Sequence, residues 1–204
     1  MRVVAALFGT LALAASAGAA GRPSVTIAAN AHVSGGDQLV LLGGTISSRK
    51  AGEPVTIEAD DCGPLSWRPA YRVRTAADGG WRSNGDTSIN TRYRARWRKA
   101  VSRTIRVDAR PQVILRTNGV GFSVDVLALD FFNGRTAVLQ RYDAEARKWH
   151  DVARANLHRN GSAAELGRSS GTFRSGAHGK LRAVLPAKQA APCYTTGISQ
   201  SLNA

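Results

Sequence analysis

Apolar and polar residues alternate along most of this chain, and the spacing of an amphipathic helix is almost absent. Alternation with period two is typical of a β-strand that has one face buried and the other in water. In one such segment, Trp67, Tyr71 and Val73 fall on one face, whereas Arg72 and Arg74 fall on the other. We therefore predict an all-β protein, with Trp67 in its core.

The alternating segments are short, and turn signals that contain glycine separate them. In the first half of the chain they are residues 24–28, 38–46, 54–59, 67–75, 80–84, 91–99 and 103–108. In the second half they are residues 112–116, 121–129, 135–140, 148–157, 163–166, 179–185 and 194–202. Seven short strands in each half predict two β-sandwiches in tandem.

A repeat supports this division of the chain. Residues 52–80 align without a gap to residues 134–162. The matched residues include Gly52 with Gly134, Trp67 with Trp149, and the turn Asp78-Gly79 with Asn160-Gly161. The period is too long for a solenoid unit and is close to the size of a small sandwich. Because Trp149 repeats Trp67, we expect it in the core of the second sandwich.

The first 20 residues have the pattern of an export signal. Arg2 precedes an apolar run, and Ala17-Gly18-Ala19 fits the small-residue cleavage pattern. A membrane anchor is the alternative, because no charge occurs between Arg2 and Arg22. After cleavage we expect a secreted, extracellular protein that no longer contacts the membrane. The predicted organisation is a signal peptide in residues 1–20, a first sandwich in residues 21–109 and a second in residues 110–204.

The order of segments in the first half resembles a known type of domain. Residues 39–45, 51–57, 75–81 and 90–95 together resemble the immunoglobulin-like and fibronectin-III-like domains found in tandem in bacterial secreted proteins. Tyr93 resembles the tyrosine corner of such domains, although Leu181 stands at this position in the second half. The resemblance implies two seven-stranded immunoglobulin-like sandwiches and a scaffolding role, since these domains serve as spacers, adhesins and appendages of enzymes.

The chain is strongly basic, with 28 Lys and Arg residues against 14 Asp and Glu residues and a net charge of +14. Period two places Arg92, Arg94, Arg96 and Arg98 on one face of a strand, about 6.6 Å apart. The predicted strands that we expect beside this one, residues 67–75 and 103–108, could supply neutralising acids. They carry arginines instead, namely Arg68, Arg72, Arg74, Arg103 and Arg106. We predict an exposed arginine row, in which replacing two members by Gln changes the stability by at most about 0.5 kcal/mol. A solvated face without a ligand is the alternative.

An exported location favours an anionic cell-wall polymer or an anionic polysaccharide as the partner of this row. Nucleic acid is not expected, because Tyr93 and Trp97, the aromatic residues between the arginines, point inward and cannot stack on bases.

Patterns for catalysis or metal binding are nearly absent. The histidines lie at no metal-ligand spacing, Ser123 lacks the second glycine and the helix of a nucleophile elbow, and Asp60-Asp61 has no third carboxylate nearby for calcium. We predict no enzymatic activity, no metal and no cofactor. The predicted function is a structural or adhesive element of the bacterial cell envelope or extracellular space. The alternative is a polyanion- or carbohydrate-binding module that uses the arginine face, and the oligomeric state stays open.

Cys62 and Cys193 are the only cysteines, one in each predicted sandwich. In an exported protein such a pair is normally oxidised. The tandem connection brings their two loops to the junction, where a bridge would contribute about 4 to 5 kcal/mol in the chain-entropy model. An intermolecular bridge or two separate thiols are the alternatives. The connection at residues 109–111, which contains Pro111, predicts a stiff joint.

Overall fold

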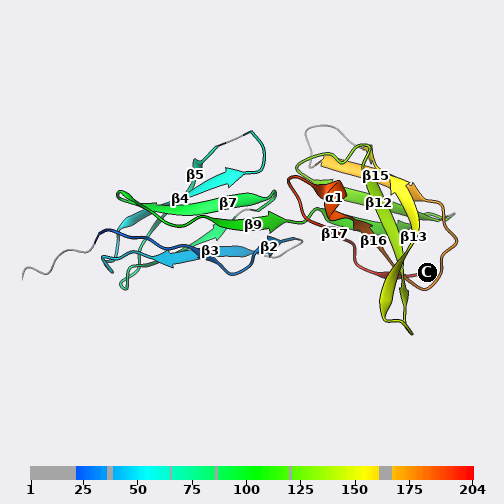
Figure 1. Ribbon diagram of the computed structural model, residues 1–204, viewed down its shortest axis with the longest axis horizontal. Coiled ribbons are helices and arrows are strands. Elements are labelled where there is room, and N and C mark those ends of the chain that lie inside the picture. The colour runs from blue at the N-terminus through cyan, green and yellow to red at the C-terminus, as the bar shows by residue number, and fades with distance from the viewer. Residues whose placement is uncertain (1–21, 36–38, 65, 86, 120, 161–166) are drawn as a thin grey trace, which may run out of the picture.

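The computed structural model describes residues 22–35, 39–64, 66–85, 87–119, 121–160 and 167–204. Nearly all of its regular structure is β-strand, which confirms the prediction of an all-β protein. Figure 1 shows the strands gathered into two lobes that lie end to end. We call residues 22–109 the N-terminal lobe and residues 110–204 the C-terminal lobe. The predicted signal peptide, residues 1–20, lies outside the described residues.

Two sheets enclose the core of the N-terminal lobe. Its strands are β1 (Ala28–Ala29), β2 (Val33–Ser34), β3 (Val40–Thr45), β4 (Pro54–Asp61), β5 (Arg68–Arg74), β6 (Gly80–Gly85), β7 (Thr91–Trp97), β8 (Ala100–Val101) and β9 (Ile105–Ala109). One sheet has the order β1-β3-β6 and the other the order β2-β9-β7-β4-β5, with β8 paired to β7. Leu42 and Trp81 from the first sheet share a buried core with Ile57 and Tyr93 from the second.

The C-terminal lobe has a second core of its own, also enclosed by two sheets. Its elements are β10 (Gln112–Thr117), β11 (Phe122–Ala128), β12 (Thr136–Asp143), β13 (Lys148–Asn156), β14 (His158–Arg159), β15 (Gly167–Phe173), β16 (Lys180–Leu185), α1 (Ala187–Ala190), β17 (Gly197–Ile198) and β18 (Leu202–Asn203). The sheets run β10-β11-β15-β14 and β13-β12-β16-β17, with β18 paired to β16. Val124 and Phe173 pack with Leu139 and Leu181 between them. Within the described part of the chain, no helix is long and apolar enough to cross a membrane.

Three features of the C-terminal lobe differ from the prediction. Strand β15 was missed because Gly-Arg-Ser-Ser-Gly-Thr-Phe shows no apolar alternation; it is a strand because it pairs with β11 along its whole length. The predicted last strand, residues 194–202, was wrong, since β17 and β18 are separate. Helix α1 is too short to produce a periodic pattern. The predicted strand at residues 163–166 lies outside the described residues.

The sequence repeat is a repeat of structure. Gly52 and Gly134 precede the hairpins β4–β5 and β12–β13 with φ values of 76° and 75°, a region that favours glycine. Their N–H groups donate to the carbonyl oxygens of Thr75 and Leu157, each at 2.8 Å. Both hairpins contain a β-bulge at the matched position. The bulges fall between Ile57 and Glu58 and between Leu139 and Gln140.

A disulfide joins the two lobes. Cys62 and Cys193 are bridged, with their Cα atoms 5.3 Å apart and 131 positions between them in the sequence. The predicted bridge is therefore confirmed, and it lies inside one chain rather than between chains. Only Arg110 and Pro111 separate β9 from β10, so the chain also crosses between the lobes by a very short connection.

Asn90 provides the hydrogen bonds at this joint. Its N–H donates to the carbonyl of Cys193 at 2.9 Å, and its carbonyl accepts from the N–H of Cys62 at 2.8 Å. The side-chain amide donates to the carbonyl of Pro192 at 3.2 Å and accepts from the N–H of Ala109 at 2.8 Å. One buried asparagine thus bonds to both ends of the disulfide and to the last residue of β9.

Replacing Asn90 by Ala should lower the free energy of unfolding by about 2 to 4 kcal/mol, because it removes two side-chain hydrogen bonds and leaves the N–H of Ala109 without its acceptor. Urea unfolding, followed by tryptophan fluorescence, measures the change. Asn203→Ala, at an exposed position in β18, is the matched control and should change the stability by less than about 0.5 kcal/mol. Equal effects of the two substitutions would contradict the role given to Asn90.

Candidate functional site

The predicted arginine row lies on the outer face of the larger N-terminal sheet. Alternate residues of β7 are buried, among them Tyr93 and Trp97, which point inward as predicted. Arg92, Arg94 and Arg96 therefore project outward. Arg98 lies one residue beyond the strand, where a φ of 52° turns the chain toward β8.

Carboxylates partly neutralise this row, since its four arginines pair with three acids, and the expectation that the neighbouring strands carry no acids was wrong. The ion pairs are Arg92 with Asp60, Arg94 and Arg96 with Glu58, and Arg98 with Glu53. The acids come from β4 and from the residue before it. Strand β4 lies between β7 and β5 in the sheet, although 29 residues lie between the end of β4 and the start of β7 in sequence. Of the two strands expected beside β7, β9 does pair with it, whereas β5 does not, and β4 was not expected there.

We call this row with its carboxylate partners the arginine ladder, and Glu58 lies at its centre. It lies opposite Arg94 in the register of β4 and β7. The Nε atom of Arg94 donates to one carboxylate oxygen at 2.6 Å, and the Nε atom of Arg96 donates to the other at 2.9 Å. The Glu58 side chain is only 12% exposed. Hydrogen bonding by Arg96, followed by hydrogen bonding and charge from Arg94, lowers the pKa of Glu58 although burial opposes this.

Trp67 also belongs to this outer face, so the prediction that it lies in the core was wrong. The bulge after Ile57 pairs Glu58 with Pro69 and so shifts the alternation of β5 by one residue. Such a shift exchanges the two faces of a strand. The half-buried Trp67 ring consequently lies against Arg94, whose guanidinium carbon is 4.2 Å from the ring centroid. The stack holds Arg94 from one side while Glu58 holds it from another.

The C-terminal lobe repeats this arrangement with one change. Its bulge places Trp149 on the outer face as well, where the guanidinium of Arg182 lies 4.1 Å from the ring centroid. The Nε atom of Arg182 donates to the side-chain oxygen of Gln140 at 2.9 Å. Gln140 thus takes the place of Glu58. The prediction that Trp149 is a core residue was wrong for the same reason as for Trp67.

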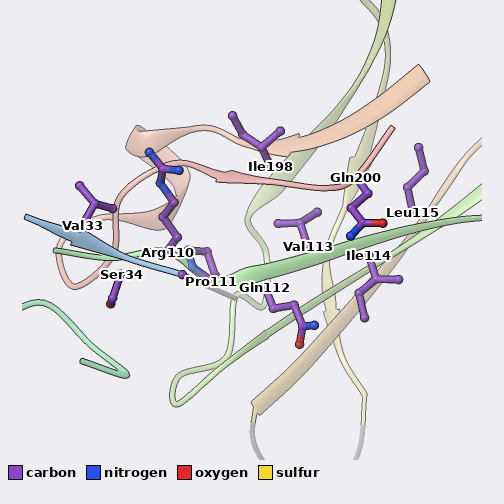
Figure 2. A pocket seen from close by; sticks show the side chains of 11 residues that line it. Val33, Ser34, Arg110, Pro111, Gln112, Val113, Ile114, Leu115, Ile198 and Gln200 are labelled. Atoms are coloured by element: carbon purple, nitrogen blue, oxygen red, sulfur yellow. The ribbon is translucent and has the colours of Figure 1, made fainter. Parts of the chain in front are cut away.

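A groove of about 590 Å³ runs along the joint between the lobes. Figure 2 shows Val33 and Ser34 at one end and Leu115 and Gln200 at the other. Among the described residues of the lining, Arg110 is the charged one, and none of them is a carboxylate, a histidine or a cysteine. The Ser34 hydroxyl donates to the carbonyl of Thr87 at 2.8 Å. The described lining residues therefore provide no acid–base pair.

The other candidate residues have structural partners. Asp60 and Asp61 form ion pairs with Arg92 and Arg68 instead of facing a common cation site. Ser123 lies within strand β11. Among the described residues, no group of three or more His, Cys, Asp or Glu side chains is arranged to hold a metal ion.

The sequence matches no protein-family model and no curated protein. Two of the solved structures to which it is weakly similar are immunoglobulin-superfamily proteins by name alone, a bovine butyrophilin and a marsupial T cell receptor. A crystal structure of bovine butyrophilin has a TM-score of 0.36 and 10% sequence identity, and the match covers 90% of this chain and 99% of that one. A marsupial T cell receptor has a TM-score of 0.32 and 13% sequence identity, and the match covers 88% of this chain and 100% of that one. At TM-scores this low, neither similarity carries a conclusion about fold or function.

Replacing both Arg94 and Arg96 by Gln should cost about 1 to 3 kcal/mol of stability, because it leaves the largely buried Glu58 carboxylate without a counter-charge. This differs from the change of at most about 0.5 kcal/mol expected for a free row. Arg103→Gln/Arg174→Gln, which removes the same charge from two exposed positions that form no ion pair among the described residues, is the control. Thermal unfolding compares the two double variants, and equal losses would contradict the ladder.

The stability should also depend on pH through Glu58. Because folding lowers its pKa, this carboxylate stabilises the fold above its unfolded pKa of about 4.3, and the contribution is lost as pH falls through the folded pKa. Wild type should therefore lose more stability than Glu58→Gln between pH 6 and pH 3. Chemical unfolding at several pH values tests this, with Glu145→Gln, in an exposed turn, as the control. Parallel curves for wild type and Glu58→Gln would contradict the assignment.

Proposed function

We propose that this protein is an exported, non-enzymatic element that acts structurally or adhesively in the bacterial cell envelope or extracellular space. In this proposal, residues 21–109 and 110–204 are two immunoglobulin-like β-sandwiches in tandem, and residues 1–20 are the signal that directs export. The two separate cores and the pairs of sheets around them support the division into two sandwiches.

The observation that carries the proposal is the joint. A structural or adhesive element has to transmit force or hold a fixed spacing, and independent domains on a flexible linker do neither. Here the Cys62–Cys193 bridge, the hydrogen bonds of Asn90 and a connection of two residues all join the lobes at one place. Thr195 adds a further bond, from its N–H to the carbonyl of Ala109 at 2.9 Å.

The same disulfide supports an exported location. Disulfides persist in oxidising compartments and are rare in the cytosol of most cells. Reduction of this bridge would remove one of the links between the lobes, so the proposed architecture depends on such a compartment.

Binding of a polyanion or a carbohydrate is the second candidate function. The specific observation that favours it is the exposed Arg72 on β5, which has no carboxylate partner among the described residues. It lies on the same outer face as the arginine ladder, since Thr56 of β4 pairs with Arg72 on one side and with Arg96 on the other.

Fractionation of the producing cell tests the first proposal. We expect the mature protein outside the cytoplasm. A non-reducing digest should contain a peptide in which Cys62 and Cys193 are joined. The protein should also stay bound to isolated envelopes in 1 M salt. Release from the envelope by salt would favour the polyanion-binding function, because screening weakens such contacts. A cytoplasmic protein with two free thiols would overturn the proposal of an exported element.

A further inference from the structure

The charges on the outer face of the larger N-terminal sheet are not distributed evenly. Near the joint, each arginine has a carboxylate of its own. These pairs are Arg92 with Asp60 and Arg106 with Asp108. This end of the face is therefore close to neutral.

At the opposite end of the face, which is the end where β4 begins, the arginines exceed the acids. Arg94 and Arg96 share the single carboxylate of Glu58. Arg74 donates to a neutral acceptor, the carbonyl of Gly52, at 2.7 Å. Arg72 has no ion pair among the described residues. Including Arg98, which pairs with Glu53, the described residues at this end carry five guanidinium groups against two carboxylates.

The strand register places three of these arginines around one spot. Arg72 and Arg96 flank Thr56 in a single cross-strand row, so their backbones are about 10 Å apart. Arg74 lies two residues along β5 from Arg72, which is about 6.7 Å. The three guanidinium groups therefore border the outer side of β4 and β5 around the half-buried Thr56, where one extended anionic chain can contact all of them.

Two of the three are already held in place. Arg96 is fixed by Glu58, and Arg74 by the carbonyl of Gly52, yet each guanidinium has five N–H donors and uses only some of them. The remaining donors match the planar, bidentate geometry of a carboxylate or a sulfate. The Arg96 side chain is 41% exposed, and Arg72 and Arg74 are exposed, so a ligand can reach all three.

We propose that Arg72, Arg74 and Arg96 form a binding site for an anionic polysaccharide that carries sulfate or carboxylate groups. The inference rests on the second function proposed above, polyanion binding, and places its site on Arg96 of β7 together with Arg72 and Arg74 of β5, rather than on the four arginines of the row alone. A polysaccharide fits better than nucleic acid, because the aromatic ring on this face, Trp67, is covered by Arg94 and is not free to stack on bases.

Salt elution from immobilised heparin, a sulfated polysaccharide, and from immobilised polygalacturonate, a carboxylated one, tests the site. Arg72→Gln/Arg74→Gln should bind about tenfold more weakly than wild type at 0.1 M salt and elute at lower salt, since it removes two charge-assisted contacts. The control is Arg141→Gln/Arg174→Gln, which removes the same charge from exposed positions of the C-terminal lobe and should elute close to wild type. Stronger retention on one of the two columns identifies the preferred anionic group.

The single variant Arg72→Gln breaks no ion pair of the described residues, so we expect it to fold like wild type. It should still bind about threefold more weakly than wild type. Equal weakening by the two double variants would overturn the site and leave only a general effect of net charge. A wild-type protein that passes through both columns would instead overturn polyanion binding itself. Tighter binding to single-stranded DNA than to either polysaccharide would overturn the choice of ligand.

Discussion

The arrangement of the two lobes depends on the joint formed by Asn90 and the Cys62–Cys193 disulfide. Asn90 is the residue before β7, so its position is set by the core of the N-terminal lobe, while its bonds reach Pro192 and Cys193 of the C-terminal lobe. Ile89, its neighbour, packs against the C-terminal core. The joint is therefore continuous with the interior of both lobes. A displacement of one lobe would break buried hydrogen bonds, which are costly to leave unmade.

A second constraint, the bulge in each repeated hairpin, determines what the outer faces carry. The alternation read from the sequence assigned Trp67 and Trp149 to the cores, and it fails because a single extra residue in a strand exchanges its faces. The bulges occur at matched positions, so the error repeats in the second copy. Local periodicity has no means of detecting a bulge. Only the pairing partner, here β4 or β12, shows where the register shifts.

The arginine ladder shows the same limit at the level of topology. The sequence predicted correctly that Arg92, Arg94 and Arg96 point outward from one strand, because this follows from period two. It did not predict Glu58 and Asp60 opposite them, because the sheet order puts a strand from earlier in the chain beside β7. The disulfide was predictable because only one pair of cysteines exists and the tandem connection brings their loops together. Asn90, in contrast, has no sequence signal, since its role depends on four partners from both lobes.

Small-angle X-ray scattering of the oxidised protein tests most directly whether the joint fixes the two lobes. If it does, the data should fit a single elongated particle with two lobes and a narrow distribution of distances between them, with a profile that matches the structure in Figure 1. A broad distribution of inter-lobe distances in the oxidised protein would contradict the account.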